Sequence, residues 1–208
     1  MDRQWFREPQ LMGALVAFLL LTAIRPHDYP TWALEVAPVV IALPLLWLAG
    51  RRMPLTSLLL ALIFLHALVL MVGGHYTYAR VPAGFWVQDW FGWERNHYDR
   101  LGHFLQGFEP AILAREILLR KGVVRRGGWL LLFVVSITLA FSAVYELIEW
   151  LVALLSEEAA ESFLGTQGDV WDTQWDMFMC LVGTFTALVT LSRLHDRQLA
   201  GKGVPRAR

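Results

Sequence analysis

Apolar residues run along this chain in long blocks that are separated by short polar stretches. Six blocks approach the roughly 20 residues that a helix needs to cross a bilayer, and the period-two alternation of a half-buried strand is absent. They lie at about 11–24, 32–49, 55–74, 99–119, 128–154 and 175–194. We therefore expect an all-α fold, a polytopic membrane helical bundle with about six transmembrane helices in a single integral membrane domain over residues 1–208.

Composition supports this class. Of 208 residues, 56% are hydrophobic and 17% are charged, whereas soluble domains carry about 25% charge. The net charge of zero leaves no global basic field, so no nucleic-acid partner is expected. The single cysteine, Cys180, excludes an intramolecular disulfide. The first apolar block lacks the small-residue cleavage pattern of a signal peptide, so we expect it to remain as an uncleaved first helix.

The positive charges predict an orientation. Lys and Arg gather before the first segment, between the second and third, between the fourth and fifth, and after the sixth: Arg3, Arg7, Arg51, Arg52, Arg120, Lys121, Arg125, Arg126, Arg193, Arg197, Lys202, Arg206 and Arg208. The stretch between the fifth and sixth segments has no Lys or Arg and holds Glu157, Glu158, Glu161, Asp169 and Asp172. The positive-inside rule places both termini in the cytoplasm and that acidic stretch outside.

The fourth segment is the weakest by hydropathy, because it begins with "YDRLGHFLQGFEP" at residues 98–110. A helix that faces protein or trapped water tolerates more polar groups than one that faces lipid. We therefore expect this helix to lie inside the bundle. Asp99, His103 and Gln106 recur at i, i+4 and i+7, which places the three side chains on one helix face.

With this topology, carboxylates and imidazoles from four helix ends converge near the outer surface. The candidates are His75, Asp99, His103, Glu146 and Glu149 of "YELIEW", Asp172 and Asp176. Ionisable groups inside a span cost several kcal/mol and rarely occur without a partner or a task. Five carboxylates at close quarters also repel one another unless a cation or an arginine compensates, and both Arg95 and Arg100 are near in sequence.

Two interpretations of this cluster remain open. In the first, His103, Glu146, Asp172 and Asp176 hold a divalent metal, and His75, Asp99 and Glu149 act as catalytic acids or bases. Mixed histidine and carboxylate ligands suit zinc, manganese or iron, whereas magnesium prefers oxygen alone. In the second, the cluster is a metal-free charged network with a structural pair of His103 and Glu146. No H-E-x-x-H motif, cysteine pair or EF-hand loop decides between them.

The stretches "YDRLGHFLQGFEP", "YELIEW" and "GTQGDVWDTQWDM" resemble the YjdF family of bacterial inner-membrane proteins, over about residues 50–195. This resemblance implies a multi-pass protein of the inner membrane and supplies no activity. A more distant similarity to VanZ-like membrane proteins is carried by three elements: Asp99, His103 and Phe104; Glu146 or Glu149; and Asp172 or Asp176 with Gly183. It implies a four-helix core and an association with cell-envelope chemistry.

Three functions follow as hypotheses. The first is a metal-dependent hydrolase or transferase that acts on a membrane lipid or a lipid-linked envelope precursor at the outer leaflet. The second is a non-enzymatic factor that binds a lipid, a drug or a partner in the polar pocket. The third is a proton-coupled transporter, in which a link between His66 and Glu109 extends the polar path inward. All three imply membrane lipids as neighbours or ligands.

Overall fold

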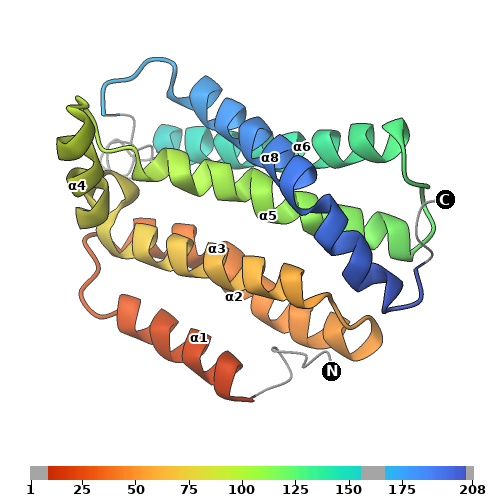
Figure 1. Ribbon diagram of the computed structural model, residues 1–208. Helices are drawn as coiled ribbons and strands as arrows, with labels where there is room; N and C mark the ends of the chain where they lie inside the picture. Colours follow the sequence, from red (N-terminus) through yellow and green to blue (C-terminus); the bar gives the residue numbers. More distant parts are fainter. Residues whose placement is uncertain (1–8, 156–166, 205–208) are drawn as a thin grey trace.

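The computed structural model describes residues 9–155 and 167–204, and the regular elements among them are helices. They are α1 (Pro9–Thr22), α2 (Tyr29–Arg52), α3 (Ser57–Tyr76), the short 3-10 helix η2 (Tyr78–Arg80), α4 (Pro82–Phe91), α5 (Tyr98–Arg120), α6 (Gly128–Leu155) and α8 (Asp172–Ala200). Figure 1 shows the long helices side by side in one bundle. The predicted all-α bundle is confirmed, and each of the six predicted segments overlaps one long helix. The sequence did not predict α4.

Four helices are long and apolar enough to cross a membrane: Tyr29–Leu48, Ser57–Tyr76, Gly128–Leu155 and Asp172–Ala200. The apolar part of α1, Met12–Thr22, is shorter. Helix α5 is not among them, because it carries too many charged residues. It lies in the middle of the bundle in Figure 1, and 13 of its 23 residues are buried. Its polar side chains therefore face protein, as expected for this segment. The number of spans and the cytoplasmic termini remain predictions.

Helices α5 and α8 pack with their backbones in contact. A Cβ atom on Gly107 would lie 1.8 Å from the carbonyl oxygen of Cys180, and one on Gly183 would lie 1.9 Å from that of Phe104. Small residues at helix interfaces allow this close approach in membrane bundles. The hydroxyl groups of Thr184 and Thr138, 2.9 Å apart, then join α8 to α6. The relative positions of the three helices are thereby fixed.

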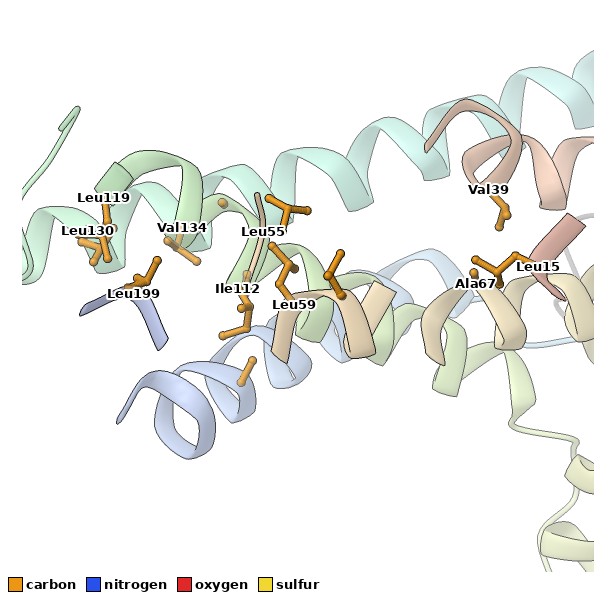
Figure 2. Packing of buried hydrophobic residues seen from close by; sticks show 14 of the residues in the cluster. Leu15, Val39, Leu55, Leu59, Ala67, Ile112, Leu119, Leu130, Val134 and Leu199 are labelled. Atoms are coloured by element: carbon orange, nitrogen blue, oxygen red, sulfur yellow. The ribbon is translucent and has the colours of Figure 1, made fainter. Parts of the chain in front are cut away.

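The apolar core extends along the bundle, from Leu15, Val39 and Ala67 to the end where α5 and α8 finish and α6 begins, which we call the apolar end. Figure 2 shows Leu119, Leu130 and Leu199 gathered there, one from each helix. The buried stripe of α6 starts with apolar side chains at this end and finishes with Glu146 and Glu149 at the other. We call the opposite end, where α3 ends and α5 and α8 begin, the polar end, because these two acids of α6 lie there.

Part of the charge pattern behind the predicted orientation lies outside the described residues. This applies to Arg3, Arg7, Glu157, Glu158, Glu161, Arg206 and Arg208, and to the side chains of Arg51 and Arg52. Among the described residues, Arg120, Lys121, Arg125 and Arg126 close the apolar end, where α5 joins α6. Asp172 opens α8 at the polar end.

Candidate functional site

Three helices place six ionisable side chains at the polar end of the bundle. Helix α5 contributes Asp99 and His103, α6 contributes Glu146 and Glu149, and α8 contributes Asp172 and Asp176. Within each helix the two residues are three or four positions apart and so share a face. All six are at most 9% exposed. The predicted convergence of these residues is therefore observed, although the contacts within the cluster differ from those expected.

Asp99, His103 and Asp176 form the tightest group. One ligand atom from each lies within 4.8 Å of the other two. The Nε2 atom of His103 is 3.6 Å from an oxygen of Asp99. Two ligand atoms on a tetrahedral zinc ion, each at about 2.0–2.2 Å from the metal, lie roughly 3.4 Å apart. Small adjustments would therefore bring these three groups to the spacing of a metal site, and we refer to them as the triad.

The second ring nitrogen of His103 points away from the triad. Its Nδ1 atom lies 3.1 Å from the side-chain oxygen of Gln106 and 3.7 Å from Oε1 of Glu146. If Nδ1 carries the hydrogen and donates to Gln106, then Nε2 presents a lone pair beside Asp99. This is the arrangement of a metal-binding histidine, whose far nitrogen is oriented by a second partner. Glu146 consequently lies on the Nδ1 side and outside the triad.

Two buried carboxylate oxygens at this site accept no hydrogen bond: Oδ1 of Asp176 and Oε1 of Glu146. Their nearest charged neighbours are Nε of Arg100 and Nδ1 of His103, each 3.7 Å away. A buried polar atom without a hydrogen bond costs about 1–3 kcal/mol. Both oxygens therefore have unused capacity to bind a cation, a water molecule or a ligand.

Asp172, a predicted metal ligand, is instead paired with two arginines. Its Oδ1 accepts from Arg95 at 2.8 Å and from Arg100 at 3.2 Å. Asp169 accepts from the same two guanidinium groups at 3.2 Å and 2.8 Å. The backbone N–H of Trp171, followed by Arg100, holds the pKa of Asp169 below its usual range. This four-residue network ties the start of α5 to the start of α8 and leaves Asp172 outside the triad.

The remaining acids of the cluster lack close ion pairs. Arg95 and Arg100 are matched by Asp169 and Asp172, so within the described residues the ion pairs left to Asp99, Glu146 and Asp176 are contacts of 3.6–3.7 Å with His103 and Arg100. Glu149, on the same face of α6 as Glu146, is also buried. A buried group of four carboxylates needs a compensating cation or bound protons.

Glu35 of α2 extends this cluster, which the sequence did not indicate. It is 3% exposed, and its Oε2 accepts a hydrogen bond of 2.8 Å from the hydroxyl of Tyr145. The ring of Tyr78 packs nearby against α3 and α5, where side chains on Gly73 or Gly102 would collide with it. Its position gives only a slight signal, because Glu35 lies in the second turn of α2, where a charged residue is common at a membrane boundary.

His75 lies apart from the triad. Its Nδ1 atom is 2.9 Å from the backbone oxygen of Thr22, so it joins the end of α3 to the end of α1. In the middle of the bundle, His66 and Glu109 form the predicted link at 3.2 Å. The second polar atom of each, Nε2 of His66 and Oε1 of Glu109, is buried without a hydrogen bond. The catalytic role assigned to His75 remains a prediction.

A further buried network at the apolar end was not predicted. Glu116 and His195 are both fully buried, 3.0 Å apart. Glu116 also accepts from Thr56 and Arg120, and His195 Nδ1 accepts from Arg115 at 2.9 Å. Every polar atom named here has a partner, so the network fastens α3, α5 and α8 together. Such satisfied networks stabilise one arrangement of helices and offer no open ligand position.

Comparison with known proteins identifies relatives of this chain but no activity. Residues 9–197 match the family described as "Predicted membrane protein (DUF2238)". The chain is 54% identical over 190 residues to "Inner membrane protein YjdF" of Escherichia coli (strain K12), which covers 91% of each chain. No solved structure matches significantly. The similarity to VanZ-like proteins remains a prediction.

Proposed function

Because the chain belongs to the DUF2238 family of predicted membrane proteins and is a multi-pass protein of the bacterial inner membrane, we propose that its triad binds a divalent metal. The metal serves an enzyme, a hydrolase or transferase, that acts on a membrane lipid or a lipid-linked envelope precursor. One observation carries the proposal: the ligand atoms of Asp99, His103 and Asp176 lie within 4.8 Å of one another beside a carboxylate oxygen that accepts no hydrogen bond.

The donor set limits which metals suit the site. One imidazole and two carboxylates suit zinc, manganese or iron(II), and an oxygen-rich remainder also suits magnesium. The proposed ligands differ from those expected from sequence, since Asp99 takes the place of Asp172, which is held by two arginines. Glu146 supports His103 from the Nδ1 side. An ion at this position would also compensate the negative charge of the buried carboxylates.

The proposed reaction depends on a divalent metal ion that lies beside buried carboxylates. A bound divalent cation activates water and polarises a phosphoryl or carbonyl oxygen. Glu149 is 8% exposed and lies among the same acids, so it is the candidate for the acid or base. The positive-inside rule places this end of the bundle outside, where lipid-linked envelope precursors present their head groups.

Metal analysis of the purified protein in nanodiscs tests the proposal. We expect about one equivalent of a divalent transition metal per chain, and loss of most of it in His103→Ala and in Asp176→Asn, because each removes one of three ligands. Glu146→Gln should keep its metal, because that side chain lies outside the triad. His66→Gln removes another, half-buried histidine and is the matched control.

Two outcomes would defeat this assignment. A folded wild-type protein that neither copurifies with nor takes up a divalent ion contradicts the metal site and favours the metal-free network. Equal metal loss in His66→Gln and His103→Ala would show that the loss reflects general damage to the bundle. A third result would change the function and keep the metal site. If the metal binds but no lipid substrate is turned over, and a lipid or drug raises the thermal midpoint, the protein is better described as a non-enzymatic binding factor.

The buried pair of His66 and Glu109 favours a second candidate, a proton-coupled transporter. The pair lies in the middle of the bundle between α3 and α5, and both side chains keep an unpartnered polar atom. Such intramembrane acids and histidines occur in proton relays. Uptake into proteoliposomes that responds to an imposed pH gradient, and is lost in His66→Gln, would support this candidate. Uptake that does not change with the pH gradient would argue against a proton-coupled transporter.

A further inference from the structure

Helix α4 and the residues just after it carry exposed aromatic side chains. Trp90 is 79% exposed, Trp86 is 63% exposed, and Phe85, Phe91 and Trp93 are also exposed. The opposite face is turned inward through Gly84, which is buried. Large exposed aromatic surfaces mark contact with a partner or a membrane, and tryptophan is the residue typical of the membrane–water interface.

The position of α4 agrees with an interfacial location. In Figure 1 it lies across one end of the bundle, with its axis steeply inclined to the long helices. It connects the end of α3 to the start of α5. A helix that crosses the ends of spanning helices runs close to the membrane plane. With ten residues it is about 15 Å long, which is too short to span.

Asn96 attaches α4 rigidly to the polar cluster. This fully buried residue donates to the carbonyl of Val81 and accepts from the backbone N–H of Tyr98, both at 3.0 Å. Its own backbone exchanges two hydrogen bonds with the side-chain amide of Gln167. Gly84 leaves the space that Asn96 occupies, because a Cβ atom there would lie 1.8 Å from Oδ1. The depth of α4 in the membrane therefore sets the depth of α5.

We propose that α4 is an interfacial helix whose aromatic face rests in the lipid head-group region. His103 lies five residues into α5, about 8 Å below its start, and Asp176 lies four residues into α8, about 6 Å below its start. The polar layer of one leaflet is roughly 5–8 Å thick. The triad is thereby held near the inner edge of the head-group layer, where the polar part of a membrane amphiphile reaches it. This inference stands whether or not the triad binds a metal.

The charge of α4 indicates which part of the lipid it contacts. Asp89 is the one charged residue between Pro82 and Phe91, so α4 has no basic side chain to attract anionic lipids. Binding therefore depends on aromatic burial at the boundary between head groups and acyl chains. The depth of α4 should be the same in zwitterionic and anionic bilayers, and should not change with salt concentration.

Depth measurement with a fluorescent probe tests the inference. Cys180 is fully buried and is replaced by serine or, if that variant does not fold, left in place unlabelled. A single NBD probe is attached at Trp90→Cys in phosphatidylcholine nanodiscs. We expect roughly twofold stronger quenching by a head-group nitroxide than by a chain-terminal one, because the two differ in depth by about 15 Å. Thr173→Cys, at the start of α8, should report a similar depth.

Two probes calibrate the scale. Val189→Cys lies on the exposed middle of α8 and should respond to the deep nitroxide, whereas Val123→Cys in the α5–α6 loop should respond to iodide in the aqueous phase. A probe at Trp90→Cys that responds to iodide and to neither lipid nitroxide would overturn the proposal. Disulfide formation between two copies through Trp90→Cys would assign the aromatic face to self-association and would equally overturn it.

Discussion

The contact between α5 and α8 predicts that Gly107→Ala both destabilises the bundle and disables the triad. The new Cβ atom would lie 1.8 Å from the carbonyl oxygen of Cys180, and ordinary contact begins at 3.4 Å, so the two backbones must separate by about 3.4 − 1.8 = 1.6 Å. Backbone atoms cannot rotate away as a flexible side chain can. Overpacking costs about 1–3 kcal/mol, and this site belongs in the upper half of that range.

The same separation affects the triad, because Asp99 and His103 lie on α5 and Asp176 lies on α8. Metal–ligand distances tolerate deviations of about 0.2 Å, which is far less than the required movement. We therefore expect Gly107→Ala to lower metal occupancy severalfold as well as the thermal midpoint, by roughly 4–12 °C for a loss of about 2–3 kcal/mol.

Thermal unfolding in nanodiscs, followed with metal analysis of the same samples, checks both effects. Gly13→Ala is the matched control, since it is another helical glycine and its Cβ atom would meet no atom within 4 Å. It should be neutral or slightly stabilising. The reasoning is refuted if Gly107→Ala melts at the temperature of Gly13→Ala and retains its metal.

Three further predictions follow. Glu116→Gln should lower the free energy of unfolding by about 3 kcal/mol, because His195 and the other groups that donate to Glu116 lose their buried carboxylate partner. A lowered thermal midpoint with unchanged metal content would support this prediction. Asn96→Ala should detach α4 from α5 and expose it to limited proteolysis, whereas protection equal to the wild type would contradict the role of Asn96. In intact cells, a membrane-impermeant maleimide should label Glu94→Cys, while Val123→Cys should react only after permeabilisation; the reverse pattern would invert the proposed orientation.

The fold was largely predictable from sequence, because long apolar blocks in a membrane protein have few solutions other than helices. Helix α4 was missed, since ten residues rich in aromatic side chains read as a loop between spans. The placement of α5 at the centre was predicted from its weak hydropathy. The close packing against α8 was not, because the importance of Gly107 depends on which backbone lies opposite it.

The candidate site was predictable as a location and less so as a set of contacts. The i, i+4 spacing of Asp99 and His103 placed both on one face of α5. The same spacing places Asp176 on one face of α8 with Asp172. Arg95 and Arg100 were recognised as possible partners for the acids, but their pairing with Asp172 could not be predicted, because it depends on how the segment before α5 packs against the start of α8. Glu116 was missed for a different reason, since charges at that end were attributed to the cytoplasmic loops.

X-ray absorption of the metal-loaded protein tests the central claim most directly, because it reports which atoms coordinate the ion. The triad predicts one imidazole nitrogen and at least two carboxylate oxygens at about 2.0–2.2 Å, with the imidazole signal absent in His103→Ala and unchanged in His66→Gln. A first shell without imidazole, or an imidazole signal that survives His103→Ala, would contradict the assignment of the metal to Asp99, His103 and Asp176.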